Sequence, residues 1–294
     1  MLLEDIIEDF IFDKRANGRA SRTIEDYHRV LDHFMAWYNS DGFNGLTAET
    51  VRAYLLHIRS NGWSQGTVAL YVRYLRAFLR WLHRRGYTVA DLSADVEAPK
   101  KVIRHDDMLT DDELARLVRS CSGKWALRDR ALILFMVDTG VRIGELVKMR
   151  RNQVNFNGDG EAWLHFGAPK TGDARYGLLG RASTAALKAY LDARDDADPA
   201  LWVGENGPLG YHAPARILTR RAKDAGIDKP VYPHLLRKYF ATKWIELGGD
   251  EQRLMILGGW RSVEMLRIYV RLGQREKLRD GHRKYSPVEN LLLE

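Results

Sequence analysis

The sequence predicts a mainly α-helical protein of two domains, the second an α+β domain with a small antiparallel sheet. Apolar residues recur at steps of three and four over most of the chain, which is typical of helices with one buried side. Only residues 152–180 show short runs typical of strands. The length of 294 residues fits two average domains. We expect a helical domain at 1–95, a linker at 96–108 and the mixed domain, with a C-terminal tail, at 109–294.

The N-terminal domain is expected to be a bundle of four helices, because no strand pattern interrupts its apolar periodicity. The helices are expected at about residues 3–14, 21–39, 47–61 and 67–85. Ser21 and Thr47 are candidate N-caps, since their hydroxyls can accept a hydrogen bond from a backbone N–H of the first turn.

The second domain is expected to begin at Thr110, because three acids follow it and acids suit the first turn of a helix. The run from Leu132 to Val137 is almost wholly apolar, which predicts a helix buried on all sides. A break at Thr139-Gly140 and a short helix over 143–149 follow. Strands are then expected at 154–156, 163–166 and 176–179, and helices resume near residues 183 and 213 and continue to about 272.

The composition argues against several classes of protein. No run of 18 apolar residues could span a membrane, and the acidic N-terminus does not suit a secretory signal peptide. Cys121 is the only cysteine, so an internal disulfide and a Cys-based zinc site are excluded and a reducing cytoplasm fits. Neither a phosphate-binding glycine loop nor a zinc-binding His-Glu-x-x-His helix is present. We therefore expect no metal, no nucleotide cofactor and no membrane association.

The positive charge of the chain is unevenly distributed. The formal net charge is +7, yet from Thr50 to Ala90 there are seven arginines and no acid. In the helix expected at 67–85, an apolar stripe occupies one side and four arginines fall within roughly 80° of each other on a different side. These are Arg73, Arg76, Arg80 and Arg84. Because no acid is placed for i,i+4 pairing, the row predicts contact with DNA phosphates, with a simple solvated helix face as the alternative.

Two short segments carry candidate catalytic side chains for chemistry on a phosphate. Arg142 follows the glycine break at 139–140, and Glu145 lies one helical turn further on, where it can orient the guanidinium. His234 and Arg237 are three residues apart in the second segment, so they share one face of a helix. An ion pair between Arg142 and Glu145 could equally be structural.

A third segment places Trp260 after two glycines and Tyr269 nine residues later. Tyrosine is a possible nucleophile once it loses its proton, and the indole N–H is a hydrogen-bond donor only. A tryptophan is also commonly a core residue. Tyr239 and Tyr285 compete with Tyr269, but Tyr239 should face away from the pocket of Arg237.

Taken in order, these segments resemble the tyrosine recombinase (phage integrase) family, including its Xer-like members. The resemblance rests on Thr-Gly-x-Arg-x-x-Glu-Leu around Arg142, on His-x-x-Arg at 234–237, and on the spacing from Trp260 to Tyr269. It also assigns Lys170 to the lysine that the family places in a β-hairpin turn, although Lys148 or Lys188 could be confused with it.

Some positions depart from the commoner family pattern. Trp260 stands where most members have histidine, Lys238 replaces a frequent histidine, and Leu266 occupies a position often held by threonine. None of these differences removes a required catalytic group. They argue against close kinship with the best-known subfamilies.

The resemblance implies a DNA recombinase that acts through a covalent 3′-phosphotyrosine. Tyr269 would attack the phosphorus and Lys170 would protonate the leaving oxygen. The remaining donors to the phosphate would be Arg142, His234, Arg237 and Trp260, with Glu145 orienting Arg142 or His234.

The same resemblance implies how the chain would meet its substrate. The N-terminal core-binding domain and the catalytic domain would clamp double-stranded DNA, and four protomers would join two DNA sites through a Holliday junction. No ATP, metal or small-molecule substrate would be needed. Two alternatives stay open: a type IB topoisomerase-like enzyme, and a DNA-binding derivative of the fold without catalysis.

Overall fold

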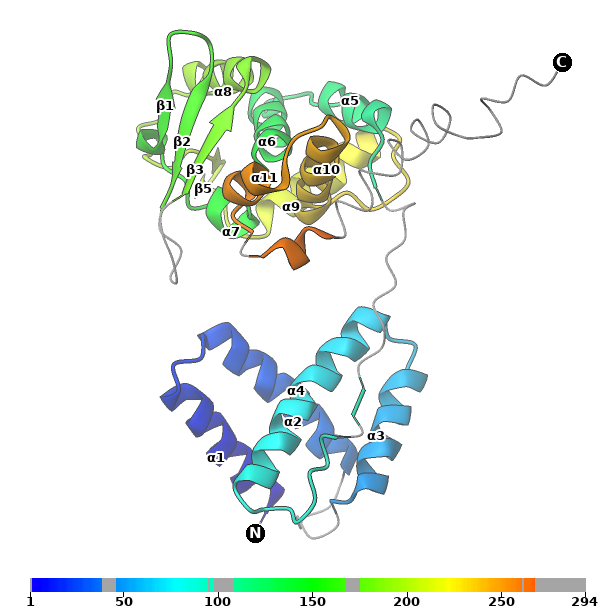
Figure 1. Cartoon of the computed structure of the whole chain (residues 1–294). Coiled ribbons are helices and arrows are strands. Elements are labelled where there is room, and N and C mark those ends of the chain that lie inside the picture. Colours follow the sequence, from blue (N-terminus) through cyan, green and yellow to red (C-terminus); the bar gives the residue numbers. More distant parts are fainter. Residues whose placement is uncertain are drawn as a thin grey trace, which may run out of the picture. The chain divides into compact units, whose positions relative to one another are not determined.

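The structure of the chain is a computed structural model. It describes residues 2–38, 46–94, 96–97, 108–167, 175–260 and 262–267, and the chain divides into two compact units, 1–103 and 104–294 (Figure 1). The predicted linker at 96–108 lies mostly outside the described residues, so its limits stay a prediction.

The described part of the first unit contains four helices, as the periodicity predicted. They are α1 (Leu3–Ala16), α2 (Ser21–Tyr38), α3 (Ala48–Ser60) and α4 (Gln65–Arg84). The hydroxyl of Thr47 caps α3 by accepting a hydrogen bond from the Thr50 N–H at 3.2 Å. The expectation that Ser21 caps α2 was wrong, because Ser21 is the first helical residue and the Ala20 carbonyl accepts the Ile24 N–H.

The core of the first unit is built on the apolar side of α4. The stripe Val68, Val72, Leu75, Leu79 and Leu82 is buried. Phe10 on α1 makes edge-to-face contacts with Tyr27, Phe78 and Trp81, with ring centroids 4.9–5.3 Å apart, the favourable arrangement for aromatic pairs. This packing fixes which side of α4 faces the core and therefore which side remains exposed.

The described part of the second unit contains more helix than strand. The helices are α5 (Asp111–Arg119), α6 (Ala126–Thr139), α7 (Ile143–Leu146), α8 (Arg181–Asp192), α9 (Ala213–Asp224), α10 (Pro233–Glu246) and α11 (Glu251–Gly258), with single 3₁₀ turns at Arg151–Gln153 and Val263–Met265. Thr110 and Glu113 form a capping box at the start of α5. The apolar helix α6 packs against α8, α10 and the sheet (Figure 1). Among the described helices, none is both long and apolar enough to cross a membrane.

The sheet of the second unit has three antiparallel strands in the order β1-β2-β3. They are β1 (Val154–Phe156), β2 (Ala162–Phe166) and β3 (Arg175–Leu179), within one residue of the predicted strands. Phe166 pairs with Arg175, and alternation puts Arg175 on the same inward side as Gly177 and Leu179.

A second, two-stranded sheet was not predicted. It pairs β4 (Val203–Gly204) with β5 (Gly207–Pro208). Strands of two residues are too short to show the alternation on which a strand prediction depends.

Candidate active site

Arg237 is a buried arginine held by the C-terminal end of another helix. It lies on α10 with 5% of its surface exposed, and its Nη1 donates a hydrogen bond to the carbonyl of Gly140, which ends α6. Carbonyls at a helix C-terminus lack intrahelical partners and carry partial negative charge. The end of α6 therefore supplies a carbonyl acceptor for the Arg237 guanidinium.

Gly140 is required at this position for two reasons. Its φ of 56° lies in the left-handed region that only glycine adopts at little cost. A Cβ atom there would also overlap the ring of Phe240 on α10. The Thr-Gly break in the sequence thus ends α6 and lets α10 approach closely enough for Arg237 to reach the Gly140 carbonyl.

Trp260 covers the guanidinium of Arg237. The Arg237 Cζ lies 3.8 Å from the centre of the indole ring, and Trp260 is 8% exposed. An arginine stacked on a tryptophan face gains a cation–π interaction and loses freedom to turn. A Cβ atom on Gly258 would overlap the indole, so this glycine makes room for the ring.

Arg142 and Glu145 contact each other at the start of α7. Arg142 Nη1 lies 3.2 Å from Glu145 Oε1, and the Arg142 backbone N–H donates to Oε2 at 3.1 Å. Arg142 Nη2 also donates to the carbonyl of Gly259, at the C-terminal end of α11. The Arg142 side chain remains 44% exposed, so a ligand can reach it.

Arg175 is a third arginine at this site, and sequence reasoning missed it. Its Nη2 donates to Glu145 Oε2 at 2.5 Å and its Nη1 donates to the carbonyl of Leu257 on α11. Its Cζ lies 4.0 Å from the ring centre of Phe166. The available signal was strand alternation, which puts this charged residue on the same side as Gly177 and Leu179.

The charges of these side chains favour an anionic ligand. Burial alone would raise the pKa of Glu145, but the hydrogen bond and charge of Arg175, with those of Arg142, lower it below its ordinary value. Glu145 is therefore ionised at neutral pH. Among the described contacts of this site, three guanidiniums (Arg142, Arg175 and Arg237) accompany one carboxylate, and such an excess of positive charge attracts an anion such as a phosphate.

The structure describes only some of the other predicted catalytic residues. His234 is exposed in the first turn of α10, one helical turn before Arg237, and a helix N-terminus favours anions. Lys170 and Tyr269 lie outside the described residues, so their roles stay predictions. Lys188, an alternative to Lys170, lies with its Nζ 5.1 Å from the ring centre of Phe156.

Tyr239 does not compete as the nucleophile. It is buried, and its hydroxyl donates to Asp111 Oδ1 at 2.7 Å. Burial and the neighbouring carboxylate both raise the pKa of Tyr239, so its phenol resists losing a proton. The other competitor, Tyr285, lies outside the described residues.

The arginine row of α4 is exposed in the first unit. All four members, Arg73, Arg76, Arg80 and Arg84, lie on the solvent side of the helix. None forms an ion pair with another described residue, whereas the adjacent Arg85 pairs with Asp13 at 2.8 Å. Four exposed cations that form no ion pair within the described residues suit contact with a polyanion.

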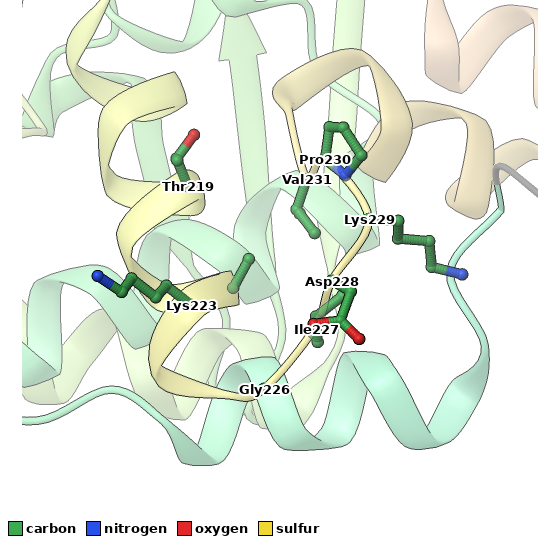
Figure 2. A pocket seen from close by; sticks show the side chains of 9 residues that line it. Thr219, Lys223, Gly226, Ile227, Asp228, Lys229, Pro230 and Val231 are labelled. Atoms are coloured by element: carbon green, nitrogen blue, oxygen red, sulfur yellow. The ribbon is translucent and has the colours of Figure 1, made fainter.

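A cavity of about 450 Å³ in the second unit lies beside the C-terminal end of α9. Figure 2 shows Lys223 and Lys229 on opposite sides of it, with Ile227 between them. Lys229 is already paired with Glu113 at 2.7 Å. No predicted catalytic side chain within the described ranges lines this cavity, and those ranges hold no cluster of three potential metal ligands.

Comparison with known proteins covers both units of the chain. Residues 107–276 match the phage integrase family, and residues 6–93 match the phage integrase N-terminal SAM-like domain. A tyrosine recombinase XerD of Halalkalibacterium halodurans is 27% identical, with 94% of this chain and 95% of that protein covered. A tyrosine recombinase XerD of Listeria monocytogenes is 29% identical, with 97% and 99% covered.

Solved structures share the fold at lower identity. A lambda integrase dimer bound to a core site aligns with a TM-score of 0.76 and 20% identity, covering 92% of this chain and 95% of that one. XerH recombinase in a post-cleavage complex with its difH substrate aligns with a TM-score of 0.74 and 18% identity, covering 94% and 83%. With more than half of its length matched by the family, and with the motif arginines grouped in one site, this chain belongs to the phage integrase family.

Proposed function

We propose that this protein is a site-specific tyrosine recombinase, which cleaves and rejoins DNA strands through a covalent 3′-phosphotyrosine. One observation carries the proposal. The guanidiniums of Arg142 and Arg237 are each held by a carbonyl at the C-terminal end of a helix, Gly259 and Gly140, and Trp260 stacks on Arg237. Such fixed donors suit the charged pentacoordinate phosphorus of strand cleavage, since they need no rearrangement during the reaction.

In the cleavage step, the Tyr269 oxygen forms a bond to phosphorus while the bond to the 5′-oxygen breaks. The phenol has an ordinary pKa of about 10, so its proton must leave during the attack, to His234 or to a phosphate oxygen. Lys170 gives a proton to the departing 5′-oxygen. The reverse transfers rejoin the strand, and the phosphotyrosine bond conserves the energy needed.

Arg142 and Arg237 stabilise the charge that develops on the two non-bridging oxygens. Guanidiniums bind such oxygens in a fixed planar geometry. The Trp260 indole N–H and His234 add donors. Glu145 keeps Arg142 oriented, because it accepts from both the side chain and the backbone N–H of that residue.

Double-stranded DNA is the proposed partner, with self-association on it. Solved relatives include a lambda integrase tetramer bound to a Holliday junction and XerH bound to its difH substrate. By analogy, four copies of this chain would exchange strands between two sites, in the cytoplasm. The arginine row of α4 would contact phosphates, and phosphate contacts position a protein without reading sequence.

The test starts by selecting duplexes that the protein binds from a pool of random sequence. A recovered site is then made as a nicked duplex, in which cleavage releases a short strand and traps the covalent adduct. We expect an adduct with the wild type and with Tyr285→Phe, and none with Tyr269→Phe. Recombinant products between two sites would separate recombination from topoisomerase-like action. A wild type that binds but forms no adduct would favour the DNA-binding derivative without catalysis.

A further inference from the structure

Arg175 connects three elements of the site through one guanidinium. It is the first residue of β3, and it reaches Glu145 on α7 and the Leu257 carbonyl on α11. It is close to the end of α11 as well, because a Cβ atom on Gly259 would lie 2.9 Å from its Cδ. Its side chain is 11% exposed, so these contacts form away from bulk water.

The groups that Arg175 contacts are the ones that hold the phosphate donors. Glu145 is the carboxylate partner of Arg142, and the Gly259 carbonyl accepts from Arg142 as well. The end of α11 leads directly into Trp260, which lies over Arg237. Without Arg175, Glu145 would lose its shorter ion pair, and the Leu257 carbonyl would lose its guanidinium donor.

We propose that Arg175 is a positioning residue for strand cleavage. It fixes Glu145 and the C-terminal end of α11 relative to each other, and thereby sets where Arg142 and Trp260 meet the phosphate. It acts through these neighbours and not on the substrate itself. This inference rests on the proposed recombinase function.

The geometry requires a guanidinium rather than any cation. One Nη atom serves a carboxylate and the other serves a carbonyl, which the planar fork of arginine does at once and the single ammonium of lysine does not. The buried Nε of Arg175 has no hydrogen-bond partner in the described part of the chain. A buried unpaired donor lowers stability, so Nε adds nothing to the contacts that the two Nη atoms make.

Arg221 provides a matched control. It is another buried arginine of the second unit, 4% exposed, and its Nε and Nη2 both donate to the buried carboxylate of Asp129. Its other hydrogen bonds within the described residues go to Ser120, Ser122 and Asp224, and not to the side chains that hold the phosphate donors. Replacing it should lower the melting temperature without a specific effect on cleavage below that temperature.

Two measurements test the proposal on Arg175→Met, Arg175→Lys and Arg221→Met. The first is single-turnover cleavage of the selected nicked duplex, together with the Kd for it. The second is hydrogen exchange at the backbone amides of Gly259 and Trp260, which donate to Ile256 and Met255 in the last turn of α11. Hydrogen exchange is measured without DNA, so it tests the positioning role of Arg175 even if the protein does not cleave DNA.

We expect Arg175→Met to slow cleavage by about 10²-fold, the usual effect of misplacing a charge-stabilising donor, with the Kd within about twofold. The Gly259 and Trp260 amides should exchange faster while those of α6 do not change. Arg175→Lys should lie between the wild type and Arg175→Met, and it carries the test if the methionine variant does not fold.

Wild-type cleavage and exchange in the Arg175 variants would overturn the proposal. So would an equal slowing of cleavage in Arg221→Met, when each variant is assayed at the same number of degrees below its own melting temperature. A wild-type protein that forms no adduct on its selected duplex would overturn the recombinase function instead, and unchanged exchange would then still count against positioning by Arg175.

Discussion

Arg237 and Gly140 are 97 residues apart in the sequence and meet through one hydrogen bond, from the guanidinium to the carbonyl that ends α6. The bond depends on the left-handed backbone of Gly140 and on the space beside Phe240. A residue without a functional side chain therefore sets the position of one of the two proposed phosphate-binding arginines.

Gly140→Ala should lower both stability and cleavage. The left-handed backbone and the overlap with Phe240 together should reduce the free energy of unfolding by about 2 kcal/mol. Denaturant titration measures this, and the adduct assay should show slower cleavage because Arg237 shifts. Gly144→Ala, in the helix α7, is the control. A Cβ atom there would lie 3.9 Å from the Tyr211 ring, which is an ordinary van der Waals distance. Equal stability of the two variants would contradict the argument.

Trp260 should have two separable roles, in packing and in hydrogen bonding. Trp260→Ala removes a buried ring and should destabilise the protein by about 3 kcal/mol. Trp260→Phe keeps a ring over Arg237 but removes the N–H donor, so it should preserve more stability while cleavage falls by about 10²-fold. Denaturation curves and single-turnover rates measure the two effects.

Trp260→His supplies the comparison for the donor role. Histidine is the commoner family residue at this position and retains an N–H, so cleavage by this variant should exceed that of Trp260→Phe. If the phenylalanine variant cleaves as fast as the wild type, the indole N–H is not a donor to the phosphate.

Stability of the first unit should fall as the pH drops below neutral. Burial, with the nearby His57, lowers the pKa of His33, whose Nδ1 lies 2.9 Å from the Tyr54 hydroxyl. The folded state therefore binds the proton less readily than the unfolded state, whose histidine has a pKa of about 6.5. The neutral side chain contributes fully above that pH, and the contribution is lost as the pH falls through the lower folded pKa.

Denaturation of the protein at pH 7.5 and pH 5 tests this sign. His33→Gln removes the titrating group and should reduce the difference in stability between the two pH values. NMR titration of the His33 ring gives its pKa directly. A value above 6.5 in the folded protein would contradict the burial argument.

Local pattern predicted the features that depend on neighbours in the sequence. The stripe of α4, the three strands and the contact between Arg142 and Glu145 all arise within a few residues, where helix and strand periodicity decide which side chains share a face. The same reasoning placed Arg73, Arg76, Arg80 and Arg84 outside the core.

That reasoning could not predict contacts between residues that are far apart in the sequence. Arg175 contacts Glu145, which is 30 residues away in the sequence, and Leu257, which is 82 residues away. No periodicity specifies which strand residue will face which helix end. The family motifs named the side chains expected at the phosphate, but not the carbonyls of Gly140 and Gly259 that hold two of them. Those acceptors depend on how α6 and α11 end against their neighbours, which tertiary packing decides.

The arginine row of α4 should bind DNA phosphates, and salt dependence offers a specific test. Each lost phosphate contact should reduce the slope of log Kd against log salt concentration by about 0.9. Arg76→Gln and Arg80→Gln should therefore weaken binding at low salt and flatten the slope, with little change in stability because both side chains are exposed. Arg85→Gln is the matched control. Arg85 lies at the C-terminal end of the same helix, α4, and is already paired with Asp13. Slopes reduced equally by all three variants would show a diffuse charge effect and not a contact row.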